Sequence, residues 1–411
     1  MRSLDANSAA ALVGSRQGDT LTVWAWYGGS LAIPTALPVT DWGLSYDTTR
    51  QIQTIDLTIA DTDGTLAPWL LDDPLGVGGS RLQVFYNIGA PLSGGQQTTL
   101  AYDWFRIVEN DPEESWLSYV VTNQGAVNVD SPLGNGVSQK WASGGATIKL
   151  KGETLTRNIA INQFLAPSSP ASGSPTVVSE IKRILADIMP VTTVSGVVDA
   201  AVPSNVIYQG DRLNAVQALA QRIGCDIRTN GSGMLEIYPI ANTGTVWTLA
   251  PGAENFQISV KRTMKLDGLY NVFVADGTGS GQNPIRGIAR ITGGPLKDGG
   301  NHGSYQTFYS SNMIATQAQA DAYAATMRDT QLRGITVPLV ATCLPDPRLQ
   351  QGDWISVNCP TTTALGSTTF PARVRTIDLK GHDGIVDAMT LGLDASYADV
   401  AARFAGVSRN G

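Results

Sequence analysis

Histidine is the side chain that most often serves as a general base or metal ligand near neutral pH. This 411-residue sequence contains only two, His302 in the segment DGGNHGS and His382 in the segment KGHDG. Both segments are glycine-rich turns, and isolated histidines in turns more often follow turn geometry than carry chemistry. The histidines therefore predict neither a catalytic site nor a metal site, and nothing else in the sequence predicts a cofactor.

The segment ADTDG, which contains Asp61 and Asp63, is similar to the start of a calcium-binding loop. An EF-hand loop also requires glycine at position six and glutamate at position twelve. Here the glycine falls at position four, and Asp72 stands at position twelve. These departures predict an Asx turn at the end of a strand rather than a calcium site.

Adjacent acids at Asp72-Asp73 and Glu113-Glu114 have the side chains that a glycoside hydrolase uses as its carboxylate pair. Such pairs occur more often as solvated acids in turns. The sequence lacks the common nucleophile, metalloprotease and dinucleotide-binding motifs. Its glycine-rich segment GTGSG, at 277–281, has no lysine for a phosphate. No catalytic residue is predicted.

The three cysteines, Cys225, Cys343 and Cys359, are too few and too widely spaced for a disulfide framework or a metal motif. Cys343 and Cys359 flank a proline-containing turn in successive strand candidates, and close approach of the two is one alternative. The favoured interpretation is that buried thiols pack as small apolar residues.

Nine tryptophans are compatible with carbohydrate binding, because exposed indole rings stack on sugars. Most of them lie in strand-like segments, which favours core or interface positions. The strand-like group comprises Trp24, Trp26, Trp104, Trp116 and Trp354.

The composition indicates a globular protein with many turns, because 42% of the residues are hydrophobic and the chain has 44 glycines and 21 prolines. Charged residues make up only 15%, compared with about 25% in typical domains. A surface so poor in charge suits a protein whose faces are covered by neighbours. The net charge of −7 and the lack of a basic cluster argue against sequence-specific nucleic-acid binding.

Two kinds of targeting segment are not expected. No apolar run reaches the roughly 20 residues that span a bilayer, so no membrane-spanning segment is predicted. The first residues, MRSLDANSAAALVGS, contain one arginine, and Asp5 interrupts their weak apolar stretch. We therefore expect no signal peptide and synthesis in the cytoplasm.

The elements that must position these residues are mostly strands. Residues 20–125 contain alternating segments of five to ten residues, which predict a small barrel or sandwich. The segment TLTVWAWYGG ends in a turn at Gly28-Gly29, and RQIQTIDLTIAD continues the alternation. Residues 126–175 have few apolar anchors and include the linker-like APSSPASGSPT, so a domain boundary is predicted there.

Residues 176–250 change to helical periodicity. Ser174 and Pro175 predict a helix start, and Asp211 predicts the start of a second helix that ends at Gly224. The following segment, CDIRTNGSGMLEIYPI, predicts a hairpin with Asn230-Gly231 at its tip. Together these segments predict a small α+β unit.

Residues 255–411 return to β-structure. A glycine-rich loop is predicted over 277–303, followed by a helix that starts near Ala315 and by three strands. The turn PDPRLQQGDW restarts an extended segment at Trp354, and a further turn is expected at 382–384. The helix is predicted to bury a stripe formed by Ala318, Ala322, Ala325 and Leu332.

Six segments in order resemble the hub-type minor tail proteins of long-tailed siphophages that infect actinobacteria. They are YDTTRQIQTIDLTIADTDGTLAP, DPLGVGGSRLQVFYNIG, GDRLNAVQALAQRIGCDIRTNGSGMLEIYP, LYNVFVADG, YQTFYSSNMIATQAQADAYAATM and LPDPRLQQGDWISV. Together they cover most of the chain, whereas residues 130–175 do not follow the family pattern. The segment TTLAYDWFRIV also lacks the glycine that usually precedes this strand.

The resemblance implies a mainly β protein with two small β-barrels of the phage tail hub type and a helix–helix–hairpin domain. The implied domains are an N-terminal barrel at 1–130, a linker and α+β insert at 131–255, and a second barrel with an Ala-rich helix and a C-terminal arm at 256–411. No catalytic residue is carried over from the family.

The resemblance also implies a homotrimer located at the tail tip of a virion. Such a trimer joins a sixfold tail tube or distal tail ring to a threefold tip around the DNA conduit. The implied partners are further copies of the chain, a distal tail protein or tail tube, a tape measure protein, and tip or central-fibre proteins.

Two other functions remain open. One is a carbohydrate-binding tail adhesin or receptor-binding component, which clusters of exposed tryptophan would favour. The other is a hydrolase that acts on a cell-wall polymer, which a cleft with two facing carboxylates would favour. The low charge and the lack of a catalytic motif favour the structural hub.

Overall fold

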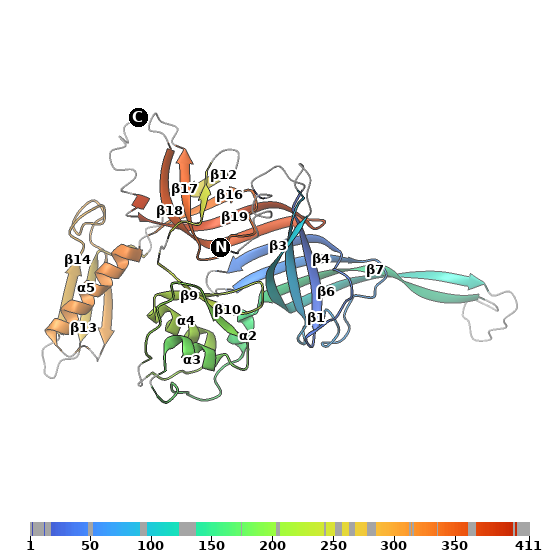
Figure 1. Cartoon of the computed structure of the whole chain (residues 1–411), viewed down its shortest axis with the longest axis horizontal. Helices are drawn as coiled ribbons and strands as arrows, with labels where there is room; N and C mark the ends of the chain where they lie inside the picture. Colours follow the sequence, from blue (N-terminus) through green and yellow to red (C-terminus); the bar gives the residue numbers. More distant parts are fainter. Residues whose placement is uncertain are drawn as a thin grey trace. The chain divides into compact units, whose positions relative to one another are not determined.

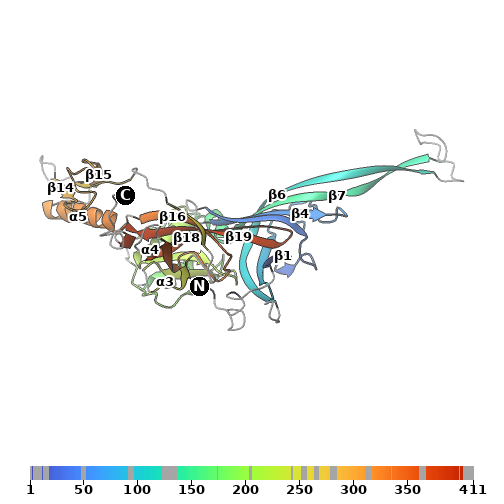
Figure 2. The same ribbon diagram turned by 90° about the horizontal axis from the view of Figure 1, so that it is seen from above.

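The protein is mainly β-structure with few helices, as predicted (Figures 1 and 2). Two compact units, each built from segments distant in sequence, make up the chain. The first unit comprises 1–259, 341–355 and 374–392, and the second comprises 260–340, 356–373 and 393–411. The computed structural model describes residues 2, 12, 18–47, 52–90, 97–122, 137–173, 175–202, 206–241, 244–250, 257–262, 268–277, 285–311, 314, 316–334, 336–360, 367–397 and 399–400.

The largest sheet has thirteen strands, most of them paired antiparallel. Along β1 the residues alternate between buried and half-buried, because one face of the sheet covers a core and the other meets solvent. The N-terminal strands are β1 (Thr20–Tyr27), β2 (Ser30–Leu31), β3 (Val39–Asp47), β4 (Ile52–Asp61), β5 (Arg81–Ile88), β6 (Thr98–Thr122) and β7 (Val137–Thr154). The strands from later in the chain are β11 (Trp247–Leu249), β12 (Gln257–Arg262), β16 (Thr336–Cys343), β17 (Trp354–Pro360), β18 (Ser367–His382) and β19 (Ile385–Ser396).

The C-terminal hairpin closes the strand pairing of the N-terminal part. β18 pairs with β3, β19 pairs with β1, and β18 and β19 pair with each other. The hydrogen-bonded order β18-β3-β4-β7-β6-β5-β1-β19 therefore returns to its starting strand. A closed order leaves no free edge on this circuit. The predicted number of separate barrels, and the predicted domain boundaries, stay predictions.

Two turns of this sheet contain glycines at the positions where the sequence predicted turns. Gly28 and Gly29 both have positive φ, of 59° and 83°, as a two-residue hairpin turn requires. Asp383 and Gly384 have φ of 46° and 73° and join β18 to β19 in the same way. Both predicted turns are confirmed. Among the described residues four strands, rather than the three predicted, follow the helix of the C-terminal part.

Strands β6 and β7 are longer than the predicted runs, at 25 and 18 residues. Residues 137–154 lie in the region predicted to have few apolar anchors, yet they form β7. Ala146, Ile148 and Leu150 are buried and alternate with outward polar residues, which is the pattern of a half-buried strand. Three anchors are enough because β7 lies between β4 and β6 in the sheet.

The outer parts of β6 and β7 form a two-stranded ribbon, residues 116–122 and 137–143. Within the described residues these segments pair only with each other, because β4 pairs with β7 over residues 146–153 and β5 pairs with β6 over residues 98–106. Figures 1 and 2 show the ribbon extending past the neighbouring strands. Trp116, at its base, is 55% exposed.

The two helices and the hairpin predicted at 176–250 are present. α4 begins after Asp211, whose carboxylate accepts hydrogen bonds from the backbone N–H groups of Leu213 and Asn214. Gly224 has φ of 67° directly after this helix, so both predicted ends are confirmed. The elements are α2 (Thr156–Ile161), α3 (Val177–Ile184), α4 (Arg212–Arg222), β8 (Val191–Thr193), β9 (Cys225–Thr229) and β10 (Leu235–Pro239).

The N-cap of α3 differs from the prediction. Thr176 caps this helix, because its hydroxyl accepts a hydrogen bond from the N–H of Ser179 at 3.3 Å. The predicted cap, Ser174, lies outside the described residues. Ile181 and Ile184 then face a core shared with α4, β9 and β10. The antiparallel pairing of β9 with β10 confirms the predicted hairpin.

A second small sheet lies in residues 268–334. β13 (Val272–Gly277) pairs antiparallel with β14 (Ile285–Arg290) and parallel with β15 (Gln306–Ser311). The prediction of a continuous loop over 277–303 is wrong, because residues 285–290 form β14. Ile285, Gly287 and Ala289 lie on its more buried side and alternate with exposed residues, which is the pattern of a half-buried strand. Residues 278–284 lie outside the described part.

Helix α5 (Gln317–Gly334) packs on this sheet through a different stripe from the predicted one. Ala320 and Ala324 are fully buried, whereas Ala318 and Ala322 are exposed. The helix approaches β14 so closely that a Cβ at Gly287 would lie 2.2 Å from the carbonyl carbon of Ala320. An Ala-rich helix carries the same side chain on several faces, so the sequence could not select the buried one.

Candidate functional site

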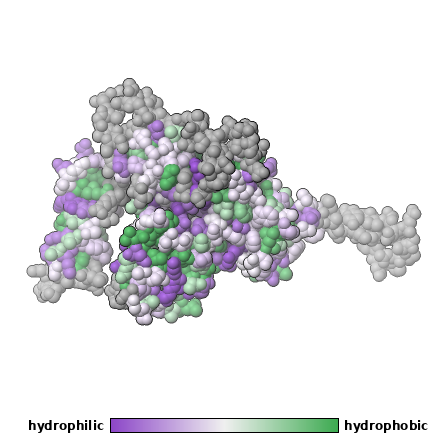
Figure 3. All heavy atoms as spheres, in the orientation of Figure 1, coloured by the Kyte–Doolittle hydropathy of each residue, from purple (hydrophilic) through white to green (hydrophobic). Residues whose placement is uncertain are grey.

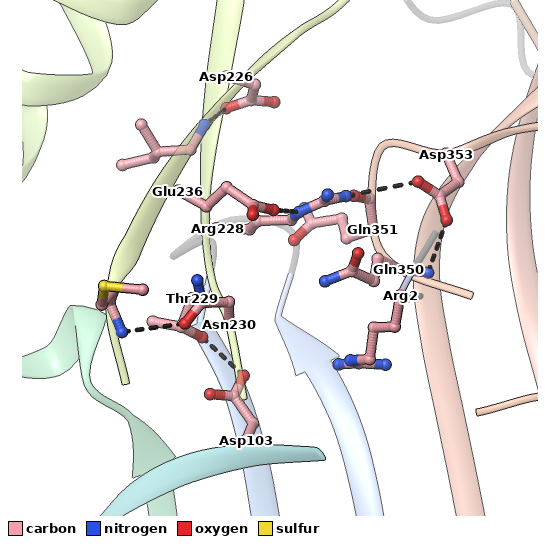
Figure 4. Close-up of polar contacts among 12 residues, drawn as sticks. Arg2, Asp103, Asp226, Arg228, Thr229, Asn230, Glu236, Gln350, Gln351 and Asp353 are labelled. Atoms are coloured by element: carbon pink, nitrogen blue, oxygen red, sulfur yellow. Dashed lines mark hydrogen bonds and ion pairs between the residues drawn. The ribbon is translucent and has the colours of Figure 1, made fainter. Parts of the chain in front are cut away.

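The turn PDPRLQQGDW lies at a junction of segments from three parts of the first unit (Figure 4). Strand β6 contributes a tyrosine and an aspartate, and the β9–β10 hairpin contributes an arginine–glutamate pair and a threonine. Arg2 and the turn complete the set. We call this set the polar junction; it comprises Arg2, Tyr102, Asp103, Arg228, Thr229, Glu236, Gln350, Gln351 and Asp353.

The turn is held by its own side chains before it meets its neighbours. Asp346 accepts a hydrogen bond from the N–H of Arg348 and forms an ion pair with its guanidinium at 2.7 Å. Asp353 accepts a hydrogen bond from the N–H of Gln350 at 2.9 Å. Gly352 has φ of 88°, and a Cβ there would lie 2.0 Å from Cε2 of Tyr238 on β10. Only glycine fits both constraints.

Arg228 joins the hairpin to the turn. Its Nε donates to Glu236 at 2.6 Å, and its Nη1 donates to the carbonyl oxygen of Gln351 at 2.7 Å. The same Nη1 lies 3.5 Å from Asp353, and the guanidinium lies 4.6 Å from the centre of the Tyr238 ring. The Arg228 side chain is only 9% exposed. A buried guanidinium fixes the positions of these partners, because its removal would take a hydrogen bond from both Glu236 and the carbonyl oxygen of Gln351.

Arg2 joins the same turn to β6. Its guanidinium donates to the carbonyl oxygens of Pro347 at 2.8 Å, Leu349 at 3.1 Å and Tyr102 at 3.1 Å. The backbone N–H of Arg2 also donates to the carbonyl oxygen of Arg348 at 2.7 Å. Its Cζ lies 4.3 Å from the centre of the Tyr102 ring, so a cation–π contact adds to the hydrogen bonds.

Asp103 joins β6 to the hairpin. Its carboxylate accepts hydrogen bonds from the Thr229 hydroxyl and from the N–H of Trp104, both at 2.7 Å. Burial raises the pKa of Asp103 to about 6, although these hydrogen bonds and the charge of Arg2 act in the opposite direction. The tip of the hairpin also lies against β6, since a Cβ at Gly231 would be 2.2 Å from the carbonyl oxygen of Ala101.

The cavity inside the polar junction has a volume of about 50 Å³. Ligand pockets usually have volumes of about 300 to 1,000 Å³, and a cavity of this size has room for ordered water only. The charged side chains of the junction form hydrogen bonds with other groups of the protein and do not point into an open space. The arrangement therefore holds three segments together, and we assign it a positioning role rather than a chemical one.

The two histidines lie in separate units, and neither lines the cavity of the polar junction. His382 is exposed and lies 3.1 Å from Asp387, and this hydrogen bond raises the pKa of His382. His302 contacts the carbonyl oxygen of Leu269 at 3.2 Å, and its ring lies 4.9 Å from that of Tyr305. Among the residues described, no group of three or more His, Cys, Asp or Glu side chains could hold a metal ion.

The acidic turn is confirmed as an Asx turn. Asp61 accepts hydrogen bonds from the backbone N–H groups of Thr65, Leu66 and Ala67, and Asp63 accepts from the N–H and hydroxyl of Thr65. Carboxylates used in this way stabilise the turn after β4. Asp73 acts similarly, because it accepts from the N–H groups of Trp69 and Leu70 at 2.6 and 2.7 Å. Glu113 and Glu114 lie on β6, not in a turn.

The cysteine prediction holds for two of the three residues. Cys225 and Cys343 are buried free thiols, and burial raises the pKa of Cys343 to about 12. Cys359 lies on β17, and its side chain is outside the described part of the structure. The strand order places β18 and β19 between β16 and β17, so the strands of Cys343 and Cys359 are not hydrogen-bonded neighbours.

The five tryptophans predicted in strand-like segments do lie in strands: β1, β6 and β17. Four of them are partly buried, whereas Trp116 is 55% exposed. Among the tryptophans whose side chains the structure describes, Trp42 is the most buried, at 3% exposure, and Trp69 is the most exposed, at 76%. Most of the strand tryptophans therefore pack as predicted, and the exposed ones mark surfaces considered below.

The sequence did not reveal the polar junction. Arg228 is 125 residues from Asp353, Thr229 is 126 from Asp103, and Arg2 is 345 from Pro347. Local periodicity carries no information about such pairs. The only available signal was the density of Asp, Arg and Gln in PDPRLQQGDW, which is unusual for a simple turn.

Comparison with known proteins gives a likeness in structure only. No protein-family model matches the sequence, and no curated protein matches it. Among solved structures, a tail protein from Neisseria meningitidis MC58 is similar with a TM-score of 0.56 and 13% identity, over 93% of this chain and 98% of that one. The 43 kDa tail protein of prophage MuSo2 from Shewanella oneidensis gives 0.55 and 11%, over 91% and 98%.

A third similar structure is the lidded PdpA–VgrG complex of Francisella, with a TM-score of 0.52 and 9% identity, over 93% of this chain and 53% of that one. Among the described residues no helix is long and apolar enough to cross a membrane. The likeness to the two tail proteins shows that the chain has the fold of phage tail proteins over nearly its whole length. The sequence resemblance implied a phage tail protein, and the structure agrees with it to that extent.

Proposed function

We propose that this chain is a structural hub at the tip of a phage tail and acts without catalysis. The observation that carries the proposal is the likeness to two tail proteins, which extends over more than nine tenths of both chains in each comparison. Likeness over the full length favours a shared architecture, because a domain that had been reused elsewhere would match only in part.

We further propose that three copies form a ring between a sixfold tail tube or distal tail ring and a threefold tip. The proposed partners are that tube or ring, a tape measure protein, and tip or central-fibre proteins. The proposal includes the actinobacterial siphophage type that the six sequence segments resemble. The closed strand order supports this proposal. A closed set of strands has no free edge and resists distortion, and a hub must keep its shape while it contacts several neighbouring proteins.

Two exposed features support assembly with other chains. Within the part of the chain that the structure describes, the ribbon of β6 and β7 is paired only with itself, and isolated two-stranded ribbons are marginally stable in water. The loop after β4 presents Trp69, Leu70 and Leu71 at 76%, 64% and 70% exposure. Contiguous apolar residues of this size on a surface usually mark an interaction site.

The apolar loop is preformed rather than loosely exposed. Asp73 binds the N–H groups of Trp69 and Leu70, and the N–H of Gly78 donates to the carbonyl oxygen of Leu71 at 2.6 Å. A Cβ at Gly76 or Gly78 would lie 2.4 Å from that carbonyl oxygen. A loop held in one shape loses little conformational entropy when it binds, which suits a docking element.

The experiment that tests the location is immunogold electron microscopy of phage particles that contain this chain. An antibody raised against the purified protein should label the distal end of the tail. Label along the whole tail tube, on the capsid, or only on unassembled protein would contradict a tail-tip hub. A tail-tube protein from the same particles serves as the control, because its label should extend along the tail.

A further inference from the structure

The small sheet of β13, β14 and β15 carries a groove of about 560 Å³ beside the C-terminal half of α5. This volume falls in the range of pockets that bind small molecules, about 300 to 1,000 Å³. The groove lies entirely within the second unit. Its walls are formed by Tyr270, Phe273, Thr307, Tyr323, Thr326, Met327 and Gln331.

The walls combine aromatic rings with uncharged polar groups. None of the lining residues is charged. Tyr270 and Tyr323 are 38% and 37% exposed, so parts of both side chains are open to solvent. The ring of Tyr309 stacks on that of Tyr323, with ring centres 4.4 Å apart and planes at 22°. Exposed aromatic side chains beside a groove are typical of binding surfaces.

The groove is also held in shape before any ligand arrives. Phe273 is 2% exposed and is part of the core beneath α5. The side-chain amide of Gln331 donates to the carbonyl oxygen of Gly268 at 3.0 Å. Binding would therefore cost little ordering of these side chains.

The lining selects among ligand classes. A charged ligand would find no opposite charge on the groove walls. The Thr326 hydroxyl already donates to the carbonyl oxygen of Ala322 at 2.8 Å. A purely aliphatic ligand would still cover the Thr307 hydroxyl without offering it a hydrogen bond, which is costly. A sugar ring has apolar C–H faces that stack on aromatic rings and hydroxyl groups that pair with hydroxyls and amides. We propose that this groove binds a neutral saccharide.

This inference goes beyond the hub role, since it adds recognition of a glycan to a protein whose proposed function is assembly. It does not depend on that role, because the groove residues all lie in one unit and require no second chain. Carbohydrate binding by tryptophan was the alternative that the sequence left open. The structure instead directs it to exposed tyrosines, Tyr323 on α5 and Tyr270 just before β13.

A glycan array tests the proposal, with the purified full chain applied to neutral oligosaccharides printed beside sialylated and sulfated forms of the same backbones. We expect retention on neutral glycans. Titration calorimetry with the best neutral oligosaccharide should then give an affinity that falls at least 10-fold in Tyr270→Ala and in Tyr323→Ala. Tyr323→Phe keeps the ring and loses the hydroxyl, so a smaller loss is expected.

Phe308→Ala is the matched control. Phe308 is 62% exposed on β15 of the same small sheet, but it does not line the groove. Its substitution should leave the affinity unchanged. No retention of any saccharide at millimolar concentration, a preference for the acidic forms, or an equal loss in Phe308→Ala would overturn the proposal. Self-association that Tyr270→Ala or Tyr323→Ala abolishes, without saccharide binding, would assign the groove to a second copy instead.

Discussion

Single residues in the polar junction bring together segments that are more than a hundred positions apart in sequence. Arg228 and Arg2 each bind the turn at 346–353 from a different side, and Asp103 binds the hairpin to β6. Buried charged groups of this kind add little net stability, but their removal is costly because the partners stay behind. The relative positions of the turn, the β9–β10 hairpin and β6 thus depend on the contacts of Arg2, Arg228 and Asp103.

The buried carboxyl of Asp103 makes a testable contribution to the pH dependence of stability. Burial raises the pKa of Asp103 to about 6 in the folded protein, compared with its ordinary value of 3.8. Asp103 therefore stabilises the fold fully below pH 3.8, and this contribution is lost as the pH rises through 6. The expected loss in the free energy of unfolding is up to about 3 kcal/mol.

Urea unfolding of the wild type and of Asp103→Asn between pH 4 and pH 7.5 measures this effect. Asparagine does not titrate and still accepts a hydrogen bond from Thr229. The stability difference between the two proteins should therefore shift in favour of the variant as the pH rises. A difference that stays constant over this range would show that Asp103 does not titrate near 6.

Arg228→Ala should be among the most destabilising single substitutions in the first unit. It removes the guanidinium that Glu236 and the carbonyl oxygen of Gln351 share, so we expect a cost of about 3 to 5 kcal/mol in the free energy of unfolding. Arg286→Ala is the control, because Arg286 pairs with Asp276 but is 54% exposed. It should cost less than about 1 kcal/mol. Equal effects in chemical unfolding would contradict the assignment.

At the scale of elements, local sequence signals predicted the features that depend on neighbouring residues, namely helix ends and turns. Asp211 and Gly224 correctly bounded α4, and Asn230-Gly231 correctly placed a hairpin tip, because caps and turns depend on nearby residues. The buried face of α5 was missed, since alanines occur on several sides of that helix. Strand β7 was missed because its pairing with β4 and β6 compensates for a weak local pattern.

The turn at Gly352 tests how closely the hairpin and the turn pack. Gly352→Ala combines a left-handed backbone with a Cβ placed 2.0 Å from the Tyr238 ring. Gly29→Ala has a similar φ, of 83°, but no atom within 4 Å of the added Cβ. We expect Gly29→Ala to cost about 1 kcal/mol and Gly352→Ala about 1 to 3 kcal/mol more. Equal losses in thermal unfolding would show that the contact with Tyr238 relaxes freely.

The apolar loop after β4 tests the proposed assembly at the same scale. Trp69→Ser combined with Leu71→Ser should weaken association between chains at least 10-fold without lowering the unfolding temperature, because both side chains are exposed in the single chain. Leu165→Ser is the matched control, since Leu165 is fully exposed as an isolated residue. Sedimentation velocity measures the association. If the control variant and the double variant behave alike, the loop is not an interface.

At the scale of the whole molecule, the fold class was predictable and the strand connectivity was not. Alternating segments and many glycines identified a mainly β protein, and the order of six segments identified a tail-protein resemblance. The pairing of β18 with β3 and of β19 with β1 joins the two ends of the chain, and no local pattern encodes it. The small sheet under α5 was missed for the same reason, because β13 and β15 pair in parallel across a long connection.

The central claim is that this protein works as a ring of three copies. Native mass spectrometry of the full chain at micromolar concentration tests it most directly. The proposal predicts a main species of about 130 kDa, which is three copies of the 43.4 kDa chain. A single species at 43.4 kDa that persists as the concentration rises, and in the presence of its tail-tube or distal-ring partner, would contradict it.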